Sequence, residues 1–291
     1  MTAVTTAPAA TRPQAPAAPA LLELEITGKC QLNCRHCYAD SGPRGGHGTM
    51  TAADWEHVID QAAAIGVKTV QFIGGEPVLA PMLPRLISHA LAAGLSVSIF
   101  SNLARVTPEL FGMFSGPRVS LSTSWYTADP AVHAQITGSK TAWASTRANI
   151  REAVSRGIDV QVKIVDGIVP GQDAAAAEAD LRELGVTSIA VRPSQGIGRA
   201  ARQENDPSEL CGHCGIGRAA VLPDGQFTLC VMARWMKTGD VRQTSVREIL
   251  AGSAWAGAMA LVPRRGRDCP PASDGGDCPP ASEVPCAPES N

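Results

Sequence analysis

The chain of 291 residues is 44% hydrophobic and carries 25 Lys and Arg against 27 Asp and Glu, a formal net charge of −2. This composition is typical of a globular protein, and the charge balance gives no general attraction to nucleic acid or to an anionic membrane surface. Polar or turn residues interrupt every hydrophobic run before the roughly 18 residues that a membrane span needs. We therefore expect no nucleic-acid partner and no membrane insertion.

Residues 1–20 are mostly Ala, Thr and Pro and contain no Leu, Ile or Phe. They lack the apolar segment of a secretory signal, so we expect a disordered tail. Nine cysteines without such a signal indicate the cytoplasm, where thiols stay reduced and clustered thiols suggest metal binding.

The next part of the chain alternates short β-rich runs with helical stretches, which is typical of βα units with a parallel sheet. The expected strands are residues 21–27, 68–73, 95–101, 118–122, 159–165 and 188–192, and the expected helices are residues 52–64, 82–93, 108–114, 141–156 and 174–184. Four helical stretches are followed by a glycine suited to a left-handed C-cap, namely Gly66, Gly94, Gly157 and Gly185. Six units predict an α/β fold, a partial (β/α)6 TIM-like barrel, with ligands at the carboxyl ends of its strands.

After residue 200 the sequence changes to Gly, Cys, Pro and short apolar runs. We expect the barrel to occupy residues 21–200 and a small cysteine-bearing domain to occupy residues 201–262. That domain has one clear helical stretch at residues 245–251, which we expect to continue to residue 261. Residues 263–291 are rich in Pro, Ser and Cys and predict a tail without a core of its own.

Three cysteines, Cys30, Cys34 and Cys37, begin three residues after the first expected strand, in a loop at its carboxyl end. Three thiolates within eight residues can hold three irons of one [4Fe-4S] cube, and the lack of a fourth nearby cysteine leaves one iron open for a substrate or cofactor. A zinc site and thiols that share a loop by chance are the alternatives.

With this CxxxCxxC motif, and with a GGEP motif at residues 74–77 after the second strand, the sequence resembles the radical S-adenosylmethionine (SAM) superfamily. The resemblance implies that SAM binds the open iron and is split to a 5′-deoxyadenosyl radical, which modifies a substrate by hydrogen abstraction. It also implies SAM contacts near the cysteine loop and the strand ends, from His36, Tyr38, Gly74, Gly75, Glu76, Pro77, Ser101, Asn102, Ser120 and Arg192. Ordinary roles in turns, strand ends and salt bridges are the alternatives.

The fourth expected strand departs from the frequent Ser-Leu-Asp-Gly form of the family, because Ser122 and Thr123 follow Leu121. This departure leaves the substrate class open. Trp125 and Tyr126 lie on the expected loop after the strand, where they line the substrate side or are ordinary surface aromatics.

A second cysteine set lies around the turn of residues 223–226: Cys211 and Cys214 precede it and Cys230 follows. The pattern predicts a hairpin with thiols at both ends. It resembles the SPASM or twitch extension, which implies an auxiliary [4Fe-4S] cluster on these three cysteines and one of the tail cysteines. The tail cysteines are Cys269, Cys278 and Cys286, and spare ones are candidate hydrogen-atom donors. A zinc ribbon is the alternative.

The resemblance favours a peptide maturase that introduces a crosslink, epimerisation or oxidation into a ribosomal precursor peptide. Expected partners are a reductant such as flavodoxin or ferredoxin and a separate leader-binding protein, because nothing before Leu21 could form a leader-binding domain. The alternatives are a radical SAM dehydrogenase or decarboxylase of a small metabolite in antibiotic biosynthesis, and a non-catalytic zinc or iron–sulfur protein.

Overall fold

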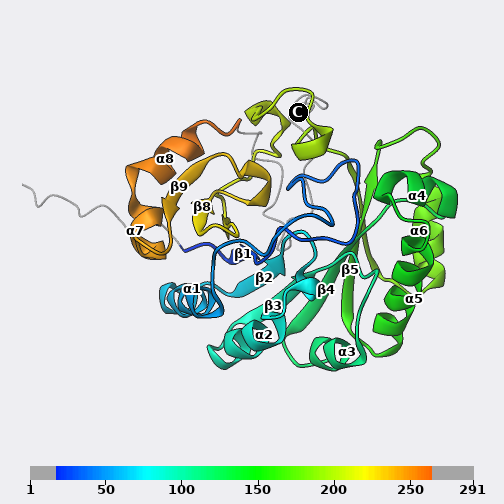
Figure 1. Cartoon of the computed structure of the whole chain (residues 1–291), viewed down its shortest axis with the longest axis horizontal. Helices are drawn as coiled ribbons and strands as arrows, with labels where there is room; N and C mark the ends of the chain where they lie inside the picture. Colours follow the sequence, from blue (N-terminus) through cyan, green and yellow to red (C-terminus); the bar gives the residue numbers. More distant parts are fainter. Residues whose placement is uncertain (1–17, 264–291) are drawn as a thin grey trace, which may run out of the picture.

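The structure, a computed structural model, describes residues 18–263. Within these residues the strands form one sheet in the order β6-β5-β4-β3-β2-β1-β7-β8-β9, with β6 and β9 at its edges. The first six strands are parallel neighbours in chain order, and their helices lie outside the curved sheet (Figure 1). The predicted partial barrel of six βα units is confirmed.

The observed bounds of the barrel elements differ little from the predicted ones. The strands are β1 (Leu21–Glu25), β2 (Thr69–Ile73), β3 (Ser96–Phe100), β4 (Val119–Trp125), β5 (Asp159–Asp166) and β6 (Ser188–Pro193). The helices are α1 (Ala52–Ile65), α2 (Leu83–Ala92), α3 (Pro108–Phe114), α4 (Pro130–Thr137), α5 (Ala142–Ser155) and α6 (Ala174–Glu183). Within residues 18–263, none of the helices is both long and apolar enough to cross a membrane.

Local capping explains where these helices begin and end. Thr51 and Asp54 form a reciprocal capping box at the start of α1. The four glycines expected after helices all have positive φ, at 92°, 87°, 70° and 86° for Gly66, Gly94, Gly157 and Gly185. A left-handed residue at these points turns the chain towards the next strand.

The prediction was wrong for the region after the fourth strand. β4 continues to Trp125, and the following segment contains α4, which the sequence reading missed. The signals for α4 were present: the Asp129 side chain accepts hydrogen bonds at the N-cap, Pro130 is the first helical residue, and Gly138 ends the helix with φ 71°. Eight residues are too few for a clear helical period, so the helix was not recognised.

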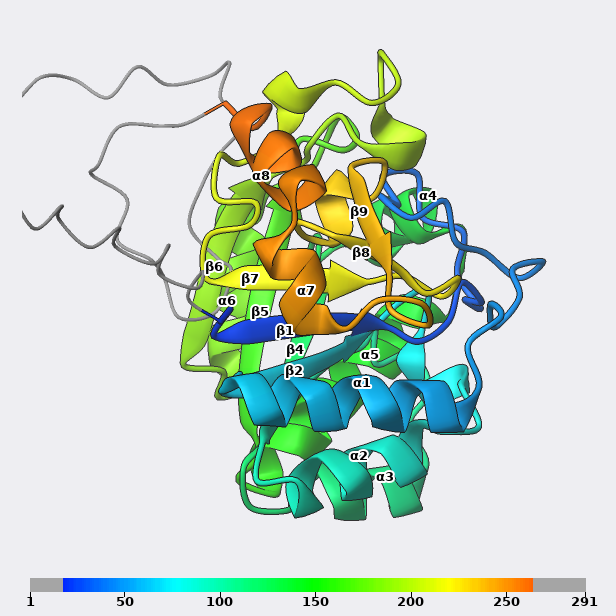
Figure 2. The ribbon, with the colours of Figure 1, turned by 90° about the vertical axis from the view of Figure 1, so that its left-hand side faces the viewer.

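After β6 the chain forms β7 (Arg218–Val221), β8 (Gln226–Thr228), β9 (Lys237–Asp240), α7 (Val246–Ala251) and α8 (Ser253–Ala260). β7 pairs in parallel with β1 and antiparallel with β8, so the sheet is continuous across residue 200, while the division into two domains stays a prediction. These five elements form the C-terminal extension of the barrel, and Figure 2 shows its helices α7 and α8 beside its strands. Gly252 is extended, with ψ 155°, so the helix expected to run from 245 to 261 is two helices.

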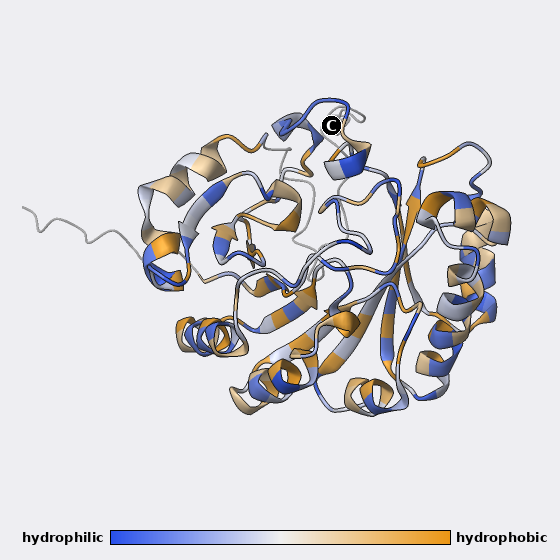
Figure 3. Ribbon diagram, viewed as in Figure 1, coloured by the Kyte–Doolittle hydropathy of each residue, from blue (hydrophilic) through white to orange (hydrophobic). Residues whose placement is uncertain are grey.

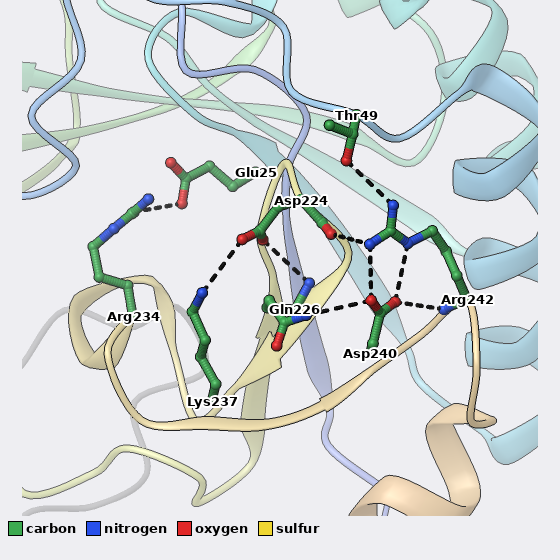
Figure 4. A network of polar contacts seen from close by, with 8 residues as sticks. All are labelled: Glu25, Thr49, Asp224, Gln226, Arg234, Lys237, Asp240 and Arg242. Atoms are coloured by element: carbon green, nitrogen blue, oxygen red, sulfur yellow. Dashed lines mark hydrogen bonds and ion pairs between the residues drawn. The ribbon is translucent and has the colours of Figure 1, made fainter.

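Polar contacts fasten the extension to the loop that leads into α1 (Figure 4). Arg242 donates to the Asp224 carbonyl at 2.7 Å, to Asp240 Oδ2 at 2.8 Å and to Thr49 Oγ1 at 3.3 Å. The amide of Thr49 also donates to the Pro223 carbonyl at 2.9 Å. The turn of the predicted hairpin is therefore held against the segment that follows the cysteine loop.

The two faces of the barrel sheet differ in polarity. Residues in register on neighbouring strands point to the same face, so each face can be described by its rows of paired residues. The face covered by helices is apolar and includes Leu24, Phe72 and Ile99, each without exposed surface. In Figure 3 the barrel strands carry both hydrophobic and hydrophilic segments along their length. The opposite, inner face is lined mainly by polar residues in cross-strand rows: Glu23, Gln71, Ser98 and Ser120 in one, Phe100, Ser122 and Gln161 in the next, and Ser124, Lys163 and Ala190 in a third.

Candidate functional site

The three cysteines of the first motif lie in a loop beyond the carboxyl end of β1, at the mouth of the barrel. Cys30 is buried, and Cys34 and Cys37 are half-buried. The Leu32 amide donates to Cys30 Sγ at 3.4 Å and the Ser41 amide to Cys37 Sγ at 3.3 Å. Donors of this kind favour thiolates and help to set the reduction potential of an iron–sulfur cluster.

Three thiols in one loop fit an iron–sulfur cluster, which binds cysteines as thiolates. Burial raises the pKa of Cys30 to about 12 and, together with the charges of its neighbouring thiols, raises the pKa of Cys34 to about 12. Both are protonated at neutral pH, and iron would have to replace those protons. No three His, Cys, Asp or Glu side chains in residues 18–263 are grouped as ligands of a single metal ion. In a cubane each thiolate binds its own iron.

The GGEP motif lies directly after β2 and packs on the start of the cysteine loop. A Cβ on Gly74, whose φ is 148°, would lie 2.3 Å from the Thr27 carbonyl, and one on Gly75 would lie 2.4 Å from the Lys29 carbonyl. The amides of Gly75 and Glu76 donate to these same carbonyls at 2.7 and 2.8 Å. The two glycines thus allow a close approach to the backbone at the start of the cysteine loop, and the SAM contact expected of the motif stays a prediction.

A single added methyl group tests this packing. Gly75→Ala should shift the start of the cysteine loop, because the new Cβ cannot stay 2.4 Å from the Lys29 carbonyl oxygen. We expect a loss of about 1–3 kcal/mol in the free energy of unfolding and less iron after reconstitution. Gly112→Ala is the matched control, since its Cβ meets nothing within 4 Å. Equal stability and iron content in the two variants would contradict the role assigned to Gly75.

Glu76 links the ends of β2 and β3 through its fully buried side chain. It accepts hydrogen bonds from Ser101 Oγ and the Asn102 amide, both at 2.8 Å, and from the Val78 amide at 3.2 Å. Burial raises the pKa of Glu76 to about 7, although the three hydrogen bonds favour the carboxylate and lower the pKa. Pro77 is buried at the start of the short 3-10 helix η1 (Pro77–Leu79). Glu76 therefore joins the carboxyl ends of β2 and β3 through hydrogen bonds.

Asn102 brings the end of β3 to the cysteine loop. Its Nδ2 donates to Cys30 Sγ at 3.6 Å, and its Oδ1 accepts from Gln31 Nε2 at 3.0 Å. The Asn102 carbonyl accepts from Thr146 Oγ1 of α5 at 2.9 Å. The structure thus brings Cys30, Asn102 and Glu76 together, as the sequence predicted.

The aromatic residues around β4 have roles that the sequence did not reveal. Tyr126 stacks edge-on with His36, with ring centroids 5.1 Å apart, and its hydrogen bond with Cys34 favours the thiolate. Trp125 is fully buried, with its ring 5.3 Å from that of His133 and 6.3 Å from that of Trp143. Trp125 therefore belongs to the core, and both expected locations for it, the substrate side and the surface, were wrong.

Three other predicted site residues, Ser120, Tyr38 and Arg192, lie at different places around the barrel. Ser120 is the second residue of β4, so its expected position at the carboxyl end of that strand was wrong; Ser124 and Trp125 end the strand. Tyr38 packs against the cluster of Ile73, Ala220 and Val231, and its buried hydroxyl has no hydrogen-bond partner in the described part of the chain. Arg192 lies on β6 in register with Val165 and is partly exposed.

His36 is largely buried, and this burial lowers its pKa to about 4, with the nearby positive charge of Arg199 acting in the same direction. The imidazole is therefore neutral at physiological pH. Among the residues that the structure describes, its buried Nδ1 has no hydrogen-bond partner. A neutral ring within the cysteine loop suits stacking or hydrogen bonding with an uncharged group.

The second cysteine set forms at the predicted hairpin. Cys214 and Cys230 are buried with their sulfur atoms 3.0 Å apart, and a hydrogen bond from Cys214 lowers the pKa of Cys211. The three thiols are thus neighbours at the base of the β7–β8 hairpin. The tail cysteines Cys269, Cys278 and Cys286 lie outside the described residues.

The C-terminal extension also covers part of the inner face of the barrel. Arg234 Nη1 donates to Glu25 Oε2 at 2.7 Å (Figure 4). The Val231 amide donates to Glu23 Oε2 at 3.1 Å. These contacts hold the short 3-10 helix η4 (Val231–Ala233) over β1. On β4 and β5, Ser124, Gln161 and Lys163 keep partly exposed surface.

The family model of the radical SAM superfamily matches residues 24–184, more than half of the chain. The chain belongs to the radical SAM superfamily, whose members use a [4Fe-4S] cluster and SAM. A PqqA peptide cyclase of Xanthomonas campestris pv. campestris is 32% identical over 161 residues, 53% of this chain and 43% of the relative. The AdoMet-dependent heme synthase of Methanosarcina barkeri is 33% identical over 134 residues, 46% of this chain and 38% of the relative. Both matches span less than half of the relative's length.

Solved structures share the fold at low sequence identity. Streptococcus suis SuiB bound to S-adenosylmethionine aligns with a TM-score of 0.71 at 13% identity, over 84% of this chain and 68% of that one. The enzyme anSMEcpe with bound AdoMet and Cp18Cys peptide aligns with a TM-score of 0.62 at 13% identity, over 82% of each chain.

Proposed function

We propose that this radical SAM enzyme modifies a ribosomal precursor peptide by hydrogen abstraction, giving a crosslink, an epimerisation or an oxidation. The observation that carries the proposal is the 32% identity with PqqA peptide cyclases across 161 residues. The shared fold with SuiB, whose structure has also been solved with the precursor peptide SuiA, adds support.

Cys30, Cys34 and Cys37 hold the cluster in this proposal, and SAM lies between the cysteine loop and the strand ends. His36, Tyr38, Ser101, Asn102, Arg192 and the backbone of residues 74–77 are its candidate contacts. When bound, the reduced cluster and SAM supply a 5′-deoxyadenosyl radical that takes a hydrogen atom from the substrate. The chain itself orients the thiolates through the amides of Leu32 and Ser41 and through Asn102.

The substrate side of the site is the inner face of β4 and β5. Ser124, Gln161 and Lys163 are partly exposed there and can hydrogen-bond to a polar chain. Lys163 also lies over the Phe100 ring, with Nζ 5.3 Å from the ring centroid, which fixes the direction of its long side chain. This polar lining suits peptide amides and carbonyls.

Cys211, Cys214 and Cys230 are proposed to hold an auxiliary [4Fe-4S] cluster of the SPASM or twitch type, with one tail cysteine as fourth ligand. Their packing supports this, because three neighbouring thiols can bind separate irons. Remaining tail cysteines are candidate hydrogen-atom donors. A reductant such as flavodoxin or ferredoxin and a separate leader-binding protein complete the proposed system, which we place in the cytoplasm.

A second candidate function is radical tailoring of a small metabolite. The 33% identity with the AdoMet-dependent heme synthase of Methanosarcina barkeri favours it, because that relative's name refers to a small molecule rather than a peptide.

One experiment separates the two candidates. Reconstituted protein with dithionite and SAM is mixed with either the peptide fraction or the small-metabolite fraction of a host extract, and release of 5′-deoxyadenosine is measured. The peptide proposal predicts that only the peptide fraction increases the release and that prior protease treatment removes the increase. Stimulation by the metabolite fraction, or by the protease-treated peptide fraction, would favour the metabolite function instead.

A further inference from the structure

We infer that Arg199 is a positioning residue that holds the cysteine loop in shape and places a fixed positive charge beside the cluster. Arg199 lies 165 residues after Cys34, in the 3-10 helix η2 (Gly198–Ala200) that follows β6. Its Nε donates to the Cys34 carbonyl at 2.7 Å, and its Nη1 donates to the Ser41 carbonyl at 2.8 Å. One guanidinium therefore joins the middle of the loop to its end.

The backbone around Arg199 fits the same loop. The Arg199 amide donates to the Cys37 carbonyl at 3.0 Å. Gly198 has a φ of 62°, and a Cβ there would lie 2.3 Å from the Cys37 carbonyl oxygen. The turn after β6 thus contacts the cysteine loop through both its backbone and the Arg199 side chain. These contacts join the segment after the last barrel strand to the loop after the first strand.

Little in the surroundings cancels the charge of Arg199. Two of its acceptors are neutral carbonyls, and its ion-pair partner Asp40 lies 2.8 Å from Nη1 with 77% of its side chain exposed, so water screens that pair. Nη2 is buried and has no hydrogen-bond partner within residues 18–263. A cation close to a thiolate-bound cluster favours the reduced state, which carries one more negative charge, and so raises the reduction potential.

This inference rests on the proposed assignment of Cys30, Cys34 and Cys37 as cluster ligands. It predicts two separable effects. Arg199→Met loses both the hydrogen-bonding fork and the charge, whereas Arg199→Lys keeps the charge but cannot bond to both carbonyls in the same way. Arg202→Met is the matched control, because Arg202 is exposed three residues further along.

The test measures bound iron and sulfide after anaerobic reconstitution and the midpoint potential of the EPR signal that responds to SAM. Arg199→Met should bind the first cluster roughly tenfold more weakly, as is usual for residues that orient metal ligands, and should have a lower potential. Arg199→Lys should also bind it more weakly but keep a potential close to that of the wild type. Arg202→Met should match the wild type in both.

Equal iron retention and potential in Arg199→Met and Arg202→Met would overturn the inference. If Arg199→Met does not fold, as judged by circular dichroism, Arg199→Lys decides, and wild-type iron retention in that variant overturns it. A wild type without iron would overturn the cluster assignment and this inference together. The peptide proposal is tested independently, because its measurement is the release of 5′-deoxyadenosine stimulated by the substrate.

Discussion

The Cys34→Ala protein should release no detectable 5′-deoxyadenosine from SAM under dithionite, whereas the wild type should release it. The substitution leaves two thiols in a loop that otherwise supplies three, and two cannot hold a cubane with one open iron. The release is measured by chromatography after anaerobic reconstitution.

Cys211→Ala is the matched control, because it removes a thiol outside the loop and should still allow cleavage of SAM. Iron counts on the triple Cys30, Cys34, Cys37→Ala variant test the second cysteine set. If the triple variant retains no iron, the auxiliary cluster is excluded. Release of 5′-deoxyadenosine by Cys34→Ala at the wild-type rate would contradict the assignment of the loop.

Replacing Glu76 with alanine should lower the free energy of unfolding by about 3 kcal/mol. The side chain is fully buried and accepts three hydrogen bonds, so its removal leaves three donors unpaired and a cavity between two strand ends. Urea unfolding of the metal-free protein measures the change. Glu183→Ala, at an exposed position of α6, should change it by less than about 0.5 kcal/mol. If Glu76→Ala lowers the free energy of unfolding no more than Glu183→Ala does, the hydrogen bonds of Glu76 do not stabilise the two strand ends.

The same carboxyl group should make stability depend on pH. Burial raises the pKa of Glu76 from 4.5 to about 7, so the folded state holds its proton more tightly than the unfolded state. The stabilisation is complete below pH 4.5 and is lost as the pH rises to about 7, by at most about 3 kcal/mol. Glu76→Gln should remove this slope. An equal slope in the wild type and Glu76→Gln would contradict the raised pKa.

Most of the barrel could be predicted because each βα unit carries its own local signals. The capping box at Thr51 and the glycine after each of four helices fix element ends within a few residues. The failure at the end of β4 came from its Ser-rich sequence, in which Ser122, Thr123 and Ser124 resemble a loop although two of the three are buried. Burial against neighbouring strands, which the sequence does not display, overrides weak local preference there.

The site was predictable where it follows strand ends and was not where it depends on distant contacts. Cys30, Glu76 and Asn102 come together because parallel strands bring their carboxyl ends to one edge. Tyr126, which follows β4, and Arg199, in η2 after β6, reach Cys34 through tertiary packing. No local sequence motif around Tyr126 or Arg199 predicts its contact with Cys34. The sequence predicted a close backbone approach at the GGEP glycines, and the structure shows one to the carbonyls of Thr27 and Lys29.

The central claim is that the cysteine loop holds a cluster with one iron open to SAM. Mössbauer spectra of the ⁵⁷Fe-reconstituted wild type, recorded before and after addition of SAM, test it most directly. Our account predicts that SAM changes the signal of a single iron site and that this change is absent in Cys34→Ala. A spectrum that SAM leaves unchanged in cluster-replete protein would contradict it.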